Sequence, residues 1–286
     1  MRPANMVTAV ADVLAGMAIA GFFTIWIPDQ SYLQSIFLLC MSTACLYAGG
    51  VVFNDVFDAE LDKVERPERA IPSAVVSKRN AIQLGAFLLT LGFSCAAFVN
   101  FTAGILAAAI LVLALVYDKW GKHQRFLGPL NMGLCRGLNL LLGISVIPQV
   151  LANWWFISCI PIVYIASITM ISRGEVYGSK RTPLQFAAVL YALVIASILY
   201  FSFIEGTIIF AIAFLSLFAW MIFKPLINAI QEPSGPNIGK SVKVGVIALI
   251  LMNASWAATA GALYIALIIL LLLPLSIWLG KKFAVT

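Results

Sequence analysis

The sequence has few charged side chains for its length of 286 residues. Asp, Glu, Lys and Arg together make up 10% of the chain, whereas hydrophobic residues make up 62%. Soluble domains devote about a quarter of their residues to charge. A chain this poor in charge cannot cover a water-facing surface, so the composition excludes an ordinary soluble domain and predicts an integral membrane protein.

Residues typical of soft-metal sites are also scarce. There is one histidine, and the five cysteines lie in apolar runs without CxxC spacing. This pattern indicates packing residues and argues against a zinc site. Segments of strictly alternating polarity, which a membrane barrel needs, are missing as well, so helices are the expected means of crossing the bilayer.

Long apolar runs are abundant, and ten of them could each cross about 30 Å of hydrocarbon. We therefore predict an all-α fold, a polytopic membrane bundle of nine or ten transmembrane helices forming a single domain over residues 1–286. The last two runs are rich in Leu and Ile and offer no candidate chemistry. The predicted spans are residues 7–28, 33–53, 80–98, 101–117, 128–148, 154–171, 184–203, 207–223, 244–260 and 262–280.

Lys and Arg are missing from every second connection between these runs, and of the eighteen basic residues only Arg136 lies inside a span. The positive-inside rule then makes the other face cytoplasmic, with both termini on it. The formal charge of +6 thus indicates a lipid bilayer as partner and not nucleic acid. The connections without Lys or Arg lie near residues 29–32, 99–100, 149–153, 204–206 and 261.

Acidic residues are equally scarce, yet six of the twelve fall between Phe53 and Ser73, directly after the second apolar run. If the helix continues, Asn54, Asp58 and Asp62 stand four residues apart and share one face. Mg²⁺ prefers oxygen ligands and often binds through one or two carboxylates together with substrate phosphates. The spacing predicts a Mg²⁺ site for a diphosphate. The alternative is a solvated loop in which neighbouring Lys and Arg pair with the acids.

Polar residues inside the spans are candidates for function or pairing. Asp12 and Arg136 could form a structural ion pair, or Asp12 could contact substrate; both alternatives stay open. Asn131 and Asn139 lie near Arg136 in sequence and should point into the bundle.

Further candidate residues lie in the later cytoplasmic connections. Lys119 follows the fourth span beside Tyr117, and the connection 172–183 carries Glu175, Lys180 and Arg181. This connection follows an even-numbered span on the same face as the acidic stretch. The segment Lys224–Lys243 reads as a plain connector.

The motif Asn54-Asp55-x-x-Asp58-x-x-x-Asp62, followed by Arg66-Pro67-x-Arg69-x-Ile71-Pro72-Ser73, resembles the first aspartate-rich signature of the UbiA superfamily of intramembrane prenyltransferases. The resemblance implies that two cytoplasmic loops, here 54–79 and 172–183, hold Mg²⁺ and the diphosphate of a polyprenyl diphosphate donor. Arg2-Pro3-Ala4-Asn5 and the segment from Arg136 to Gly143 look like the EboC-like branch of that superfamily.

The resemblance assigns roles to individual residues. It implies Asn54, Asp58, Asp62 and Glu175 as metal ligands, and Asn54, Arg69, Lys180 and Arg181 as diphosphate-binding residues. It implies Asp58, Asp62, Lys119 and Arg136 as catalytic, and leaves Asp12, Asn131 and Asn139 as acceptor-binding or structural.

The sequence departs from this family in two respects. In the second loop Glu175 replaces the later aspartate, and Ile171 occupies the position of the earlier one. We therefore expect Lys180 and Arg181 to supply positive charge there. A tenth span also exceeds the usual nine.

Other functions compete with prenyl transfer. Polar residues at membrane depth, among them Asn253, could line the path of a transporter or flippase, and the eroded second loop is compatible with a non-catalytic UbiA-like binding protein. Phosphatidyl transfer is disfavoured, because the Asp-Gly and Ala-Arg pairs expected for it are missing. The acceptor is left open as aromatic, tetrapyrrole or polyol, and the expected location is the bacterial inner membrane.

The one-sided distribution of Lys and Arg leads to a test of topology. Single cysteines placed in 54–79 and in 172–183 should both be labelled from the cytoplasmic side by a membrane-impermeant thiol reagent. Labelling of the two segments from opposite sides would rule out a shared active site.

Overall fold

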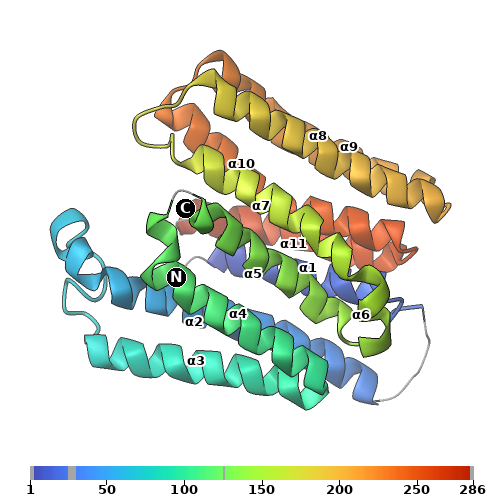
Figure 1. The fold of residues 1–286 in the computed structure, drawn as a ribbon, viewed down its shortest axis with the longest axis horizontal. Helices are drawn as coiled ribbons and strands as arrows, with labels where there is room; N and C mark the ends of the chain where they lie inside the picture. Colours follow the sequence, from blue (N-terminus) through green and yellow to red (C-terminus); the bar gives the residue numbers. More distant parts are fainter. Residues whose placement is uncertain (1–2, 25–29, 125, 284–286) are drawn as a thin grey trace.

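The computed structural model describes residues 3–24, 30–124 and 126–283, and over these residues it contains helices and turns without a strand. The helices lie side by side, and their connections gather at the two ends of the bundle (Figure 1). This arrangement confirms the predicted all-α membrane bundle.

The helices occur at the ten predicted positions, but several bounds differ. The first span was predicted to reach residue 28, whereas its helix ends at Ile19, and residues 25–28 of that span lie outside the described part of the chain. One 3₁₀ turn, Trp155–Ser158, joins α6 to α7, so that these two helices together make one span. The helices are α1 (Pro3–Ile19), α2 (Gln30–Glu65), α3 (Lys78–Val99), α4 (Phe101–Lys119), α5 (Leu127–Ile144), α6 (Pro148–Trp154), α7 (Cys159–Ser172), α8 (Arg181–Ile204), α9 (Ile208–Gln231), α10 (Gly235–Thr259) and α11 (Leu263–Lys282).

Eight helical segments among the described residues are long and apolar enough to cross a membrane. Two further segments complete the ten predicted positions. Helix α1 is apolar but has only 17 residues, since the chain turns at Gly21, which has a φ of +73°. Helix α5 has 18 residues and carries Arg136 and two asparagines.

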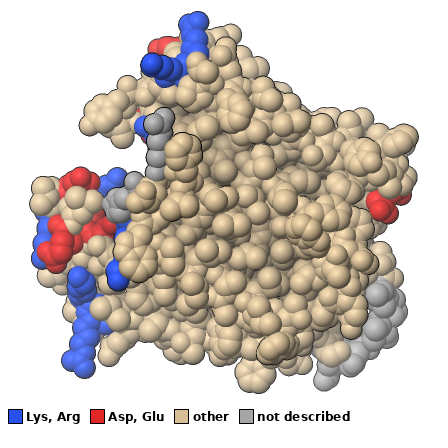
Figure 2. All heavy atoms as spheres, viewed as in Figure 1, with Lys and Arg blue, Asp and Glu red and all other residues tan. Residues whose placement is uncertain are grey.

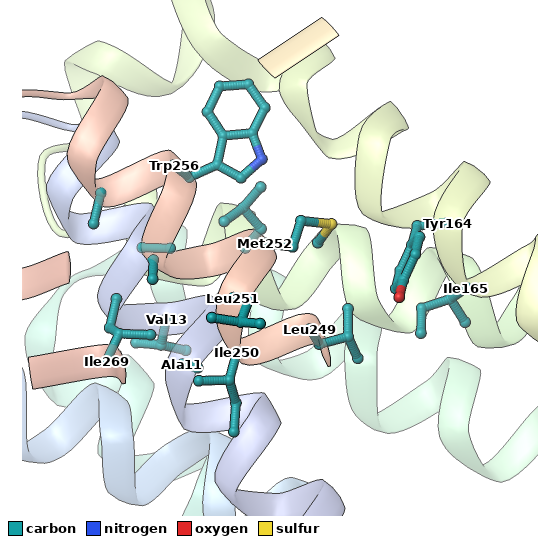
Figure 3. Close-up of a cluster of buried hydrophobic side chains, with 14 of the residues drawn as sticks. Ala11, Val13, Tyr164, Ile165, Leu249, Ile250, Leu251, Met252, Trp256 and Ile269 are labelled. Atoms are coloured by element: carbon teal, nitrogen blue, oxygen red, sulfur yellow. The ribbon is translucent and has the colours of Figure 1, made fainter. Parts of the chain in front are cut away.

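Helix α10 lies at the centre of the bundle, and 83% of its most apolar window is buried. Figure 3 shows Ile250 and Leu251 of α10 on the side of Val13 of α1 and Ile269 of α11, whereas Leu249 lies toward Tyr164 and Ile165 of α7. A helix surrounded by other helices must be apolar on every side, which explains why α10 reads as a continuous apolar run.

Glycines allow α1 and α5 to approach closely. A Cβ atom added at Gly16 would lie 2.2 Å from the carbonyl oxygen of Leu140, and one added at Gly143 would lie 2.2 Å from that of Val13. Small residues at helix contacts are typical of membrane bundles. This close approach brings the polar residues of α1 and α5 within reach of one another.

The prediction of a plain connector over Lys224–Lys243 is wrong. Helix α9 continues to Gln231 and α10 begins at Gly235, which leaves three residues between them. Helix α9 extends beyond its hydrophobic run because Pro225 does not end it. The proline lies inside the helix and is buried. Membrane helices tolerate proline when neighbouring groups satisfy the freed backbone.

The contact between α1 and α5 gives a prediction about stability. Gly16→Ala should destabilise the fold by about 1–3 kcal/mol, because the added methyl group meets backbone atoms that cannot yield without separating the helices. Thermal unfolding of the purified protein in detergent would measure this.

The matched control is Gly239→Ala in α10, where the nearest heavy atom to an added Cβ is 4.0 Å away. This variant should unfold at the parent temperature or slightly above it, since Ala favours a helix. If Gly16→Ala and Gly239→Ala lower the unfolding temperature equally, the close contact between α1 and α5 is not the cause of the destabilisation at Gly16.

Candidate active site

The acidic stretch lies at the end of α2, which projects beyond the other helices. Its 36 residues make a helix about 54 Å long, whereas the hydrocarbon core is about 30 Å thick. The helix ends at Glu65, two residues before Pro67, as the proline predicts. Figure 2 shows Lys, Arg, Asp and Glu atoms gathered at this end of the visible face, while most of the remaining surface is uncharged.

A cavity of about 390 Å³ opens beside this end of α2. It is amphipathic, with a charged mouth and an apolar body. The mouth is lined by Asn54, Asp55, Asp58, Arg66, Arg69, Tyr117, Asp118 and Lys122. The body is lined chiefly by apolar residues of α1, α2, α4, α5, α7 and α10, among them Ala9, Leu46, Ile110, Ala114, Met132, Ile165 and Val246.

Each acid of the α2 motif is paired with a cation. Asp58 accepts a short contact from the Lys122 ammonium. One Nη of Arg69 lies 2.8 Å from Asp62 and 3.3 Å from Asp55. Arg69 reaches them because the chain turns back after the helix end. The mouth therefore has closely matched opposite charges.

Of the predicted set of ligands on one helix face, Asn54 and Asp58 line the cavity, as the spacing of four residues predicts. Asn54 donates to a carboxylate oxygen of Asp118 at 3.0 Å. Asp62 lies one turn further along, is 4% exposed, and faces Arg69 instead of the cavity. The sequence thus predicted that these residues share one helix face. It did not predict that the chain folds back after α2 and brings Arg69 to Asp62.

Lys119 does not lie at the cavity. Its ammonium is 4.4 Å from the centre of the Trp120 ring, on the exposed surface. The chain leaves α4 at Trp120 and turns through a 3₁₀ segment, and this turn directs Lys122 toward Asp58. Sequence reasoning missed Lys122 and Asp118, although their spacing of four residues beside Tyr117 was a usable signal.

Arg136 and Asp12 form an ion pair of 2.7 Å inside the bundle. Arg136 also donates to the Thr8 hydroxyl at 2.6 Å. Asn139 and Asn253 donate to Asp12 at 3.0 and 2.7 Å. This network favours the structural alternative for Asp12, which is 1% exposed.

Two members of the network, Arg136 and Asn139, also line the deep part of the cavity. Asn131 is buried and accepts from the Cys135 thiol at 3.7 Å, outside the cavity lining. The candidate catalytic role of Arg136 therefore remains a prediction, since its guanidinium is both paired with Asp12 and present at the cavity wall.

The second predicted loop lies at the same end of the bundle but on a different part of it (Figure 1). Arg181 donates to the carbonyl of Gln231 at 3.1 Å, and a Cβ at Gly178 would lie 2.7 Å from the Pro233 carbonyl oxygen. The segment thus packs on the connection between α9 and α10. Among the described residues that line the cavity, none belongs to 172–183, so the contribution of Glu175, Lys180 and Arg181 remains a prediction.

The oxygen donors at the mouth fit a hard divalent cation. Asp55, Asp58 and Asp118 supply carboxylates and Asn54 an amide oxygen among the residues that line the cavity, which is the donor chemistry of Mg²⁺ sites. Within the described part of the chain no three acidic, histidine or cysteine side chains already lie grouped as a metal site, so the donors would have to converge on the ion as it binds. Lys122 already forms an ion pair with Asp58, and Arg69 forms one with Asp55. A metal ion would therefore replace existing cations without leaving an unfavourable excess of positive charge.

Comparison with known proteins agrees with this geometry. Residues 13–237 match the UbiA prenyltransferase family, and the chain belongs to that family. Nothing in the comparisons tests the EboC-like branch.

Among curated proteins, the chain resembles those named digeranylgeranylglyceryl phosphate synthase. It is 29% identical to that of Saccharolobus solfataricus over 54% of this chain and 55% of the relative. It is 31% identical to that of Ignicoccus hospitalis over 62% of this chain and 56% of the relative. The chain thus spans about half the length of the curated relatives it matches.

Solved structures show the same fold. A UbiA homologue from Aeropyrum pernix K1 superposes with a TM-score of 0.70 at 17% identity, covering 87% of this chain and 96% of that one. A UbiA homologue from Archaeoglobus fulgidus bound to DMAPP and Mg²⁺ superposes with a TM-score of 0.60 at 16% identity, covering 92% and 99%.

The buried ion pair gives a second prediction about stability. Asp12→Ala should destabilise the protein by about 3–5 kcal/mol, because it leaves the Arg136 guanidinium buried without its counter-charge. Adding Arg136→Met in the same chain should restore part of this loss. Thermal unfolding in detergent of the single and double variants would measure the coupling, and strictly additive losses would show that the two charges do not interact.

Proposed function

We propose that this protein transfers a prenyl group from an allylic polyprenyl diphosphate to a small acceptor at the end of the bundle where α2 projects. The observation that carries the proposal is the cavity itself, whose charged mouth and apolar body match the head and chain of a prenyl diphosphate. Membership of the UbiA prenyltransferase family supports it. So does the homologue of known structure that is bound to DMAPP and Mg²⁺.

The diphosphate would bind to the cations at the mouth. Lys122, Arg66 and Arg69 all line it, and charge-assisted hydrogen bonds to phosphate oxygens are stronger than neutral ones. Asn54 and Asp58 are the residues best placed to hold Mg²⁺, and Asp55 and Asp118 line the same cavity. Bound there, Mg²⁺ supplies positive charge to the departing diphosphate.

The reaction breaks the bond between C1 of the prenyl group and the bridging oxygen of the diphosphate, and the oxygen keeps the electron pair. A nucleophilic atom of the acceptor then bonds to C1 and gives up its proton. Cations fixed where negative charge develops lower the barrier, and single preorganised donors contribute about 3–4 kcal/mol. The apolar body of the cavity limits water, which would otherwise capture the allylic group.

The network around Asp12 argues against the transporter alternative. Arg136, Asn139 and Asn253 all donate to the Asp12 carboxylate across α1, α5 and α10, whereas a transport path needs polar groups that are free to exchange partners with a substrate. Most of the charged residues on the visible face gather instead at one end of the bundle (Figure 2).

The substrate and the location complete the proposal. We assign the projecting end of α2, with both chain termini, to the cytoplasmic side of the cell membrane. Whether that membrane is bacterial is part of the proposal, since the relatives named above are archaeal. The names of those relatives favour a prenylglyceryl phosphate acceptor over aromatic, tetrapyrrole or other polyol acceptors.

An assay with purified protein tests the proposal. Radiolabelled geranylgeranyl diphosphate and Mg²⁺ would be supplied with a prenylglyceryl phosphate, an aromatic acid or a free polyol, and products separated by chromatography. The parent should prenylate at least one acceptor. Asp58→Ala should lower the rate by about a hundredfold or more, since it removes a carboxylate from the metal site.

Glu60→Ala is the matched control, because Glu60 is an exposed acid of the same helix paired with Lys63 at 2.8 Å. It should keep nearly the parent rate. An equal loss in both variants would indicate a general effect of surface charge. Tight binding of a non-hydrolysable diphosphate analogue by the parent, without transfer to any acceptor, would support the non-catalytic alternative.

A further inference from the structure

A second cavity, of about 210 Å³, lies at the opposite end of the bundle from the candidate active site. It is formed where α1 and α10 end, where α6 meets α7, and where α8 turns into α9. No residue that lines it also lines the first cavity. Its lining residues include Ile157, Trp154, Phe201, Glu205, Trp256 and Thr259.

Aromatic rings form one wall of this second cavity. The ring centres of Trp154 and Phe201 are 6.2 Å apart, and those of Phe201 and Trp256 are 5.7 Å apart. Aromatic rings attract cations through their π faces, and aromatic cages bind quaternary ammonium groups.

The usual reason for tryptophan at this depth is the aromatic belt at the membrane interface, but it does not account for Trp256. Belt residues face lipid, as Trp155 does with 59% exposure, whereas Trp256 is 2% exposed. In Figure 3 the indole of Trp256 points away from the labelled aliphatic cluster.

Two buried polar atoms of the second cavity have no hydrogen-bond partner within the described part of the chain. They are Nε1 of Trp256 and the hydroxyl oxygen of Thr259, and both residues line the cavity. Buried polar groups are almost always hydrogen-bonded in native proteins. The N–H of Trp256 can only donate, so its acceptor has to come from outside the described side chains.

Glu205 supplies negative charge to the second cavity. It ends α8 in a turn held in place by Thr207, whose hydroxyl donates to the carbonyl of Thr259 at 2.8 Å. No Lys or Arg occurs between residues 182 and 223 or between 244 and 280. Among the ion pairs of the described residues, none involves Glu205.

We propose that this second cavity is a binding site for an organic ammonium group that also carries an oxygen acceptor. The cation would lie against the aromatic wall near the Glu205 carboxylate, and its oxygen would accept from Trp256 and Thr259. An amino alcohol and the head group of a zwitterionic phospholipid share this chemistry. The site lies among helix ends, at the level where head groups occur.

The test uses the purified full chain in non-ionic detergent and radiolabelled choline as the probe, with binding measured by equilibrium dialysis. The parent should bind choline saturably. Glu205→Gln should weaken binding about tenfold by removing the charge, and Trp256→Phe about threefold or more by removing the donor while keeping a ring. Glu232→Gln is the matched control, because Glu232 likewise ends a helix, α9, but lies far from this cavity.

Competition identifies the chemistry that is recognised. The neutral carbon isostere of choline, 3,3-dimethylbutanol, should compete poorly. Displacement of choline by added phosphatidylcholine but not by phosphatidylglycerol would identify the source as a lipid head group, and a lack of displacement would identify a free amine.

The proposal is overturned if the parent shows no saturable choline binding, if Glu205→Gln and Glu232→Gln weaken binding equally, or if the neutral isostere competes as well as choline. Glu205 is exposed, so its substitution leaves the fold intact even if Trp256→Phe does not. Prenyl transfer is not involved in any of these measurements, so failure of the proposed function would not affect them.

Discussion

The ion pair between Asp12 and Arg136 is the interaction on which the inner structure depends. Two charges in a bilayer interior are tolerated only when they neutralise each other and their remaining hydrogen bonds are made. Asn139 and Asn253 complete the pair, so α1, α5 and α10 meet at one carboxylate. The glycine contact between α1 and α5 and the central position of α10 follow from the same requirement, because the three helices must approach closely enough to share it.

At the mouth of the first cavity, charge is arranged differently. Here the carboxylates and cations are partly exposed and come from segments that approach one another at the surface: α2, the chain after it, and the turn after α4. Water is available to replace a lost partner. Charges in the interior therefore hold the fold, whereas charges at the mouth can exchange partners with a substrate. Arg136 belongs to both groups, since it is paired with Asp12 and also lines the cavity.

Properties that depend on local spacing could be predicted from the sequence. The ten spans follow from apolar runs, and the common face of Asn54 and Asp58 follows from helical periodicity. Contacts set by turns could not be predicted. Lys122 replaces Lys119 at the cavity because the chain bends at Trp120, and Asp62 turns to Arg69 because the chain folds back after Pro67. The second cavity was missed because Trp256 and Thr259 read as part of an apolar span, and only the fold brings them near Glu205.

The contact between Lys122 and Asp58 joins the end of α2 to the turn after α4 across the mouth of the cavity. A metal ion held by Asp58 would share this carboxylate with the ammonium of Lys122 or compete with it, so ion binding would weaken the Lys122 contact. The freed ammonium then lies beside the bound ion, where an anionic head group would be attracted to both. The same side chain would then balance the charge of Asp58 in the absence of an ion and lie free to contact an anionic head group in its presence.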